Sequence, residues 1–151
     1  KQARSGSIIS MSSVAGVTGG LGPHAYAAAK HAVVGITRNL AAEVCAFGVR
    51  VNCIAPYSVA TPMVAQAYLD DHTDIDSTLK MLTDESPLSG RPGLADDVAN
   101  AVLWLASDES GYTSGHTLTI DAGITTGSMA GPPRFAEKAP LMREAGKRGV
   151  E

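Results

Sequence analysis

The strongest constraint on the fold of this chain is a long helical pattern between two short apolar runs. The helical pattern extends from about 23 to 47, and the flanking runs cover 7–11 and 49–55. Pro23 suits a first helical turn, where its missing N–H needs no partner, and Gly48 is typical of the position where a helix ends. A helix of this length between two strands predicts a right-handed crossover that joins parallel neighbours. The expected fold class is therefore α/β.

Two more regular elements are expected downstream. Asp96 and Asp97 are well placed for a helix N-terminus, and apolar residues follow them at helical spacing. A third strand is expected over 117–121. Between them and the second strand, residues 57–91 show a looser pattern, which we interpret as a helical flap over a site. Residues 124–151 mix Gly, Pro and charged residues without a clear period, so we expect a C-terminal tail.

Charge and cysteine usage exclude several classes of function. Lys and Arg number 12 against 15 Asp and Glu, for a net charge of -3, and no basic block lies on an expected helix, so a nucleic-acid partner is not expected. No apolar run approaches the length of a membrane span, which argues against a membrane partner. Cys45 and Cys53 form no CxxC pair and are expected to be buried thiols in a reducing compartment, which favours the cytoplasm.

A tyrosine and a lysine one helical turn apart form the main candidate site. Tyr26 and Lys30 should lie on the same face of their helix, so the lysine ammonium can approach the tyrosine ring. A phenol ordinarily has a pKa of about 10, and a nearby positive charge stabilises its ionised form. The pair could therefore exchange a proton with an alcohol. Ser13 follows the first strand at the edge where open parallel sheets bind ligands, and its hydroxyl could hold a substrate oxygen.

Other polar and small residues are better explained by structural roles than by catalysis or ligand binding. Four glycines between the first strand and the helix could suggest a phosphate-binding turn: Gly16, Gly19, Gly20 and Gly22. The spacing does not match, and the next strand lacks the acid that would hold a ribose, so we expect a turn at a pocket rim. The four histidines lack ligand spacing, and no metal site is expected. Trp104 lies among the apolar residues of its helix and is expected in the core.

Several motifs together resemble the short-chain dehydrogenase/reductase family, over almost all of 6–123. They are Ser13, the Y-A-A-A-K segment at 26–30, V-R-V-N-C-I-A-P followed by Y-S-V-A-T-P-M at 49–63, and the last helix with G-H-T-L-T-I-D-A-G. The residues of these motifs are similar to those of plant members of the family that oxidise terpenoid-type secondary alcohols. The resemblance implies a Rossmann-type, doubly wound parallel sheet, of which residues 1–123 would be the C-terminal half with about three strands.

The resemblance also implies an activity and a set of site residues. A hydride would pass between NAD or NADP, with NAD favoured, and a secondary alcohol or ketone. Tyr26 would act as the acid/base, Lys30 would assist it and hold the cofactor ribose, and Ser13 would orient the substrate oxygen. The other residues expected at the nicotinamide are Pro56, Val59 and Thr61, and those expected at the substrate are Ala15, Tyr57 and Met63. Residues 57–91 would cover the substrate.

Important parts of the family pattern would belong upstream of Lys1. They are the glycine-rich turn, the residue that selects NAD or NADP, and a catalytic asparagine, so we expect the chain to be a piece of a longer protein. The expected partners are a small-molecule substrate and further copies of the same chain. The copies would form a homodimer or homotetramer through the 23–47 and 95–107 helices. An alternative from another class is a non-catalytic module that only dimerises.

Overall fold

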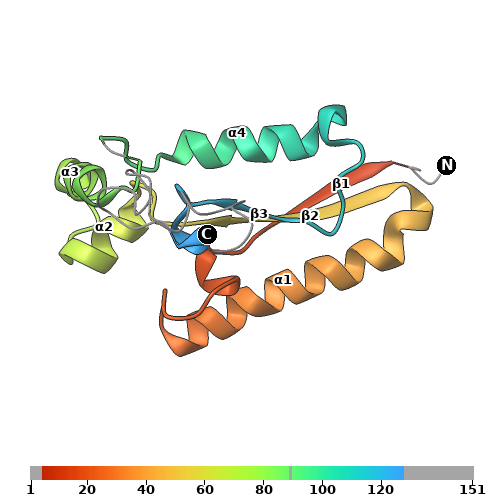
Figure 1. Ribbon diagram of the computed structural model, residues 1–151, viewed down its shortest axis with the longest axis horizontal. Coiled ribbons are helices and arrows are strands. Elements are labelled where there is room, and N and C mark those ends of the chain that lie inside the picture. The colour runs from red at the N-terminus through yellow and green to blue at the C-terminus, as the bar shows by residue number, and fades with distance from the viewer. Residues whose placement is uncertain (1–4, 89, 128–151) are drawn as a thin grey trace, which may run out of the picture.

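Three parallel strands form a sheet that has one long helix on each face (Figure 1). The computed structural model describes residues 5–88 and 90–127. Strands β1 (Gly6–Met11), β2 (Val49–Pro56) and β3 (Thr117–Ile120) lie in that order across the sheet. Helix α1 (His24–Val44) covers one face and helix α4 (Ala95–Ala106) the other. The predicted α/β class with a parallel sheet is confirmed.

The β1–α1–β2 unit follows the expected crossover. Met11 pairs with Ile54, so the carboxyl ends of β1 and β2 lie at the same edge of the sheet. The last turn of the expected 23–47 helix is a 3-10 turn at Cys45–Phe47. Gly48 ends it with a φ of 71°, in the left-handed region that glycine adopts without strain.

Two shorter helices lie at the end of the sheet where the strands finish (Figure 1). They are α2 (Pro62–Leu69) and α3 (Ile75–Glu85), and both fall in the segment expected to be a helical flap. Thr61 caps α2 by accepting a hydrogen bond from the Val64 amide at 3.4 Å. That these helices cover a substrate stays a prediction. Residues Ile124–Thr126 form a 3-10 turn, and the expected tail from 128 onward lies outside the described residues.

The core is built around the central strand. β2 is buried on both faces, and α1 and α4 each add apolar side chains to it; the core includes Val34, Ala41, Val51, Cys53, Ile54, Ala55 and Leu105. The expected burial of Cys53 is confirmed, but that of Cys45 is wrong, because Cys45 lies in the exposed turn after α1. Trp104 is 38% exposed rather than in the core, because it is rotated by about 100° from the buried Leu105.

Two polar side chains of β2 fix the loop that leads to β3. Asn52 is fully buried; its Nδ2 donates to the Thr113 carbonyl at 2.8 Å, and its Oδ1 accepts from the His116 amide at 3.0 Å. Arg50 donates to the carbonyls of Leu105 and Ser107, each at 3.0 Å, at the end of α4. These bonds place β3 beside β2. In the described part of the chain, no helix has the length and apolar character needed to cross a membrane.

Candidate active site

Tyr26 and Lys30 lie on one face of α1, as their spacing predicts. Lys30 Nζ is 5.5 Å from the centre of the Tyr26 ring. The same amine donates to the Met11 carbonyl at the end of β1, at 3.1 Å. Tyr26 keeps 38% of its surface exposed, so the residue is not buried beneath the helix. The expected approach of the ammonium to the phenol is confirmed, and Lys30 ties this pair to the carboxyl edge of the sheet.

A close contact between α1 and the end of β1 holds Lys30 in place. Ser12 is buried, and its hydroxyl donates to the Lys30 carbonyl at 2.9 Å. A Cβ on Gly16 would lie 2.6 Å from the same carbonyl oxygen, closer than real Cβ atoms come to other atoms. Sequence reasoning missed both residues as parts of the site. The sequence offers one signal for them, a glycine at the turn from strand to helix, and this turn is expected only to shape a pocket rim.

Ser13 lies at the same edge of the sheet, just beyond β1. Its Oγ accepts a hydrogen bond from the Ala15 amide at 3.2 Å, which fixes the side chain at the start of a 3-10 turn over Val14–Gly16. Ser13 is half-buried, whereas Ala15 has no exposed surface. A substrate contact through the Ala15 side chain, as expected from the resemblance, is therefore not available in this structure. Ala15 acts on Ser13 through its backbone instead.

The residues expected at the nicotinamide follow β2, the neighbour of β1. Pro56 ends the strand, and Val59 and Thr61 lie in the loop between β2 and α2. All three are half-buried, and Thr61 Oγ1 donates to the Val59 carbonyl at 3.3 Å. Because β1 and β2 end at the same edge, this loop and Ser13 lie at neighbouring strand ends. Open parallel sheets bind their ligands at such an edge.

A cavity of about 380 Å³ opens between this loop, the end of α3 and the end of β3. Its apolar wall includes Leu82, Leu88 and Ile120. Tyr57, expected at the substrate, also lines it, and burial together with the nearby Tyr68 raises the pKa of the Tyr57 hydroxyl. Tyr57 is therefore a neutral phenol in a wall that combines apolar residues with charged ones such as Glu85 and Asp121. Ser13, Tyr26 and Lys30 are not part of the cavity wall, nor is Met63, which is 70% exposed on α2.

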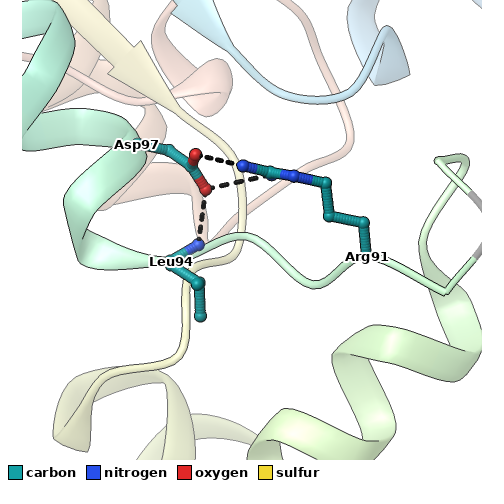
Figure 2. A network of polar contacts seen from close by, with 3 residues as sticks. All are labelled: Arg91, Leu94 and Asp97. Atoms are coloured by element: carbon teal, nitrogen blue, oxygen red, sulfur yellow. Dashed lines mark hydrogen bonds and ion pairs between the residues drawn. The ribbon is translucent and has the colours of Figure 1, made fainter.

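The two aspartates of the cavity wall are held as carboxylates. Burial would raise the pKa of Asp121, but hydrogen bonds from the hydroxyl and amide of Thr125 and the amide of Gly123 outweigh it and lower the pKa. Asp97 is bonded to Arg91 and to the Leu94 amide, and both interactions lower its pKa (Figure 2). Within 5–88 and 90–127, no three His, Cys, Asp or Glu side chains are grouped to hold a metal ion.

The sequence matches a known family over most of its length. The family model described as "Enoyl-(Acyl carrier protein) reductase" matches residues 1–125. The chain is similar to (+)-borneol dehydrogenase 2 of Salvia officinalis, with 48% identity over 132 residues that cover 85% of this chain and 46% of that protein. Xanthoxin dehydrogenase of Arabidopsis thaliana is 48% identical over 126 residues, which cover 81% of this chain and 44% of that protein. The chain thus spans less than half the length of these relatives.

Solved structures share the same arrangement. A 3-oxoacyl-[acyl-carrier protein] reductase from Brucella melitensis, with bound NAD, aligns with a TM-score of 0.64 and 35% identity over 81% of this chain and 42% of that chain. A gluconate 5-dehydrogenase from Burkholderia cenocepacia, in complex with NADP and tartrate, aligns with a TM-score of 0.67 and 31% identity over 82% of this chain and 46% of that chain.

Proposed function

Because this chain belongs to the short-chain dehydrogenase/reductase family, in the branch of the plant terpenoid dehydrogenases, we propose that it forms the catalytic half of a nicotinamide-dependent alcohol dehydrogenase. The observation that carries the proposal is the position of Lys30 Nζ, 5.5 Å from the Tyr26 ring and bonded to the Met11 carbonyl. This arrangement places a fixed positive charge beside an exposed phenol at the ligand-binding edge of the sheet. Such a pair is suited to acid/base chemistry on an alcohol.

The proposed reaction oxidises a secondary alcohol to a ketone. When bound, the nicotinamide ring supplies the acceptor for the hydride that leaves the carbinol carbon. Tyr26, in its ionised form, takes the proton from the substrate hydroxyl, and Ser13 Oγ donates a hydrogen bond to the substrate oxygen. Lys30 stabilises the phenolate and binds the cofactor ribose. In the direction of reduction, the Tyr26 hydroxyl returns the proton to the same oxygen.

The residues after β2 fit a nicotinamide in chemical type and in place. Val59 offers backbone polar groups and Thr61 a hydroxyl, which suit the carboxamide of the ring, and Pro56 offers an apolar surface. They lie at the strand end next to that of Ser13. We propose NAD as the cofactor in preference to NADP, on the basis of the resemblance to the plant branch.

We further propose a terpenoid-type alcohol or ketone as the substrate. Support comes from the apolar part of the wall of the 380 Å³ cavity, formed by Leu82, Leu88 and Ile120, beside which Tyr57 lies. Met63, exposed on α2, is proposed to contact the substrate, while Ala15 acts only by orienting Ser13.

Both cysteines are free, which agrees with a reducing compartment and supports a cytoplasmic location.

Replacing Lys30 tests this proposal in the complete enzyme that contains the chain. Lys30→Met keeps the length of the side chain but removes its charge, so turnover of a secondary terpenoid alcohol such as borneol with NAD should fall by about 100-fold or more. Lys80→Met, on the exposed surface of α3, is the matched control and should leave turnover unchanged. Equal activity of Lys30→Met and the wild type would refute the proposed role of the amine.

A second candidate function is a non-catalytic module that dimerises through α1 and α4. The observation in its favour is the exposure of large apolar side chains on these helices, 64% for Ile36 and 70% for Leu103. The same surfaces would build a homodimer or homotetramer of the enzyme. Titration with NADH of the complete protein that contains this chain separates the two functions, because saturable binding favours the enzyme. A dimer in sedimentation without NADH binding favours the module.

A further inference from the structure

The loop proposed to line the nicotinamide, residues 57–61, is held by the segment that leads into α4. This inference rests on the proposed function, because that function assigns the loop to the cofactor. The Ala60 amide donates to the Gly93 carbonyl at 3.0 Å. A Cβ on Gly93 would lie 2.7 Å from the Ser58 carbonyl oxygen and 3.2 Å from the Val59 side chain. The two backbones therefore touch directly, with no room for a side chain between them. Any displacement of Gly93 is transmitted to the loop.

Asp97, in the first turn of α4, fixes the segment that contains Gly93 (Figure 2). Its Oδ2 accepts from the Leu94 amide at 2.9 Å and from Arg91 Nη1 at 3.1 Å, and its Oδ1 pairs with Arg91 Nη2. One carboxylate thus binds Arg91, two residues before Gly93, and Leu94, directly after it. The Asp97 side chain is 22% exposed and the Arg91 side chain 55%, so these bonds lie at the surface of the protein.

We propose that Asp97 and Gly93 are positioning residues for the cofactor: Asp97 fixes residues 91–94, and Gly93 holds the 57–61 loop in the conformation that accepts the nicotinamide. Thr61 links the 57–61 loop to α2, because its hydroxyl donates to the Val59 carbonyl and accepts from the Val64 amide in the first turn of α2. The acid/base group is supported separately, by β1 and α1. In the described part of the chain, Ser13, Tyr26 and Lys30 form no hydrogen bond with residues 91–94.

The two partners of Asp97, Arg91 and the Leu94 amide, should not contribute equally. The Arg91 side chain is 55% exposed, and exposed ion pairs contribute little. The bond to the Leu94 amide, which also belongs to the helix N-terminus, should contribute more. We therefore expect Asp97→Ala to have the largest effect, because it removes both partners. Asp97→Asn, which keeps an oxygen for Leu94, and Arg91→Met should have smaller effects.

The test compares cofactor and substrate kinetics in the complete enzyme. Gly93→Ala and Asp97→Ala should raise the KM for NAD by about tenfold, the equivalent of one lost hydrogen bond, while kcat changes by less than about threefold. Gly6→Ala is the matched control, because its Cβ would lie at an ordinary 3.9 Å from Val49. The hydrogen exchange rate of the Ala60 amide should also rise at least tenfold in both variants and not in the control.

The outcomes separate this inference from the proposed function. An unchanged KM for NAD, or a loss of kcat with no change in that KM, would overturn the inference, since either would indicate general damage or no coupling. Unchanged exchange at Ala60 in Asp97→Ala would also overturn it. If the wild type shows no NAD-dependent turnover, the proposed function fails, and the exchange of Ala60 alone then decides whether Asp97 holds the loop. If Gly93→Ala does not fold, Asp97→Asn gives the same comparison with a smaller expected shift.

Discussion

Adding one methyl group at Gly16 should push helix α1, which carries Tyr26 and Lys30, away from the end of strand β1. The Cβ of an alanine would lie 2.6 Å from the Lys30 carbonyl oxygen and 2.4 Å from Ser12 Oγ, whereas ordinary contacts begin near 3.4 Å. The backbone of α1 therefore has to move by about 0.8 Å. Overpacking of this kind costs about 1–3 kcal/mol, and loss of the Ser12 hydrogen bond adds about 1 kcal/mol. A displacement near 1 Å at a catalytic group can cost about 100-fold in rate.

Gly16→Ala is best measured by urea unfolding and by alcohol turnover in the complete enzyme. The expected result is a loss of about 2–4 kcal/mol in the free energy of unfolding, together with a fall in kcat of about 10- to 100-fold. Gly19→Ala, in the same loop, is the control, because its Cβ would meet no atom within 4 Å. If both variants are as stable and active as the wild type, the contact between Gly16 and Lys30 does not hold the site.

Three further predictions concern stability measured by urea unfolding. Hydrogen bonds lower the folded-state pKa of Asp121, so its contribution is complete above the unfolded value of about 3.9 and is lost as the pH falls through the lower folded value. The free energy of unfolding of Asp121→Asn should therefore vary less below about pH 5, and an equal slope would refute this reasoning. Thr37 is 1% exposed, and its hydroxyl has no partner among the described residues, so Thr37→Val should leave stability unchanged or raise it by about 1 kcal/mol. A marked loss would reveal a partner for that hydroxyl. Asn52→Leu should lower stability by about 2–4 kcal/mol, because the Thr113 carbonyl and the His116 amide lose their partner. A loss under about 1 kcal/mol would contradict that account.

The elements that depend on local signals could be predicted from the sequence. The strand–helix–strand unit and its end at Gly48 follow from apolar periodicity and from the conformational freedom of one glycine. The position of β3 beside β2 could not be predicted in the same way. It depends on Asn52 and Arg50, whose partners lie more than 50 residues away in the chain. The exposure of Cys45 and Trp104 differs from the prediction because an apolar helix pattern does not show which face meets the sheet.

The same distinction between local signals and distant contacts applies to the candidate site. Tyr26 and Lys30 could be paired from the sequence, because helical geometry alone brings residues four apart together. The groups that hold this pair could not. Gly16 contacts Lys30 across a turn, and Gly93 contacts Ser58 across the fold. Such close approaches between backbones leave no periodic pattern, and the sequence shows only a glycine in each case, with nothing that marks its contact.

The turnover of Tyr26→Phe in the complete enzyme tests the central claim most directly. Only the phenolic oxygen is removed, so the account predicts a fall in kcat of about 10²- to 10⁴-fold with little change in the affinity for NADH. Tyr112→Phe, at a fully exposed tyrosine away from the site, should behave as the wild type. Retention of more than a few per cent of turnover by Tyr26→Phe would contradict the account, because the group that exchanges the proton would then lie elsewhere.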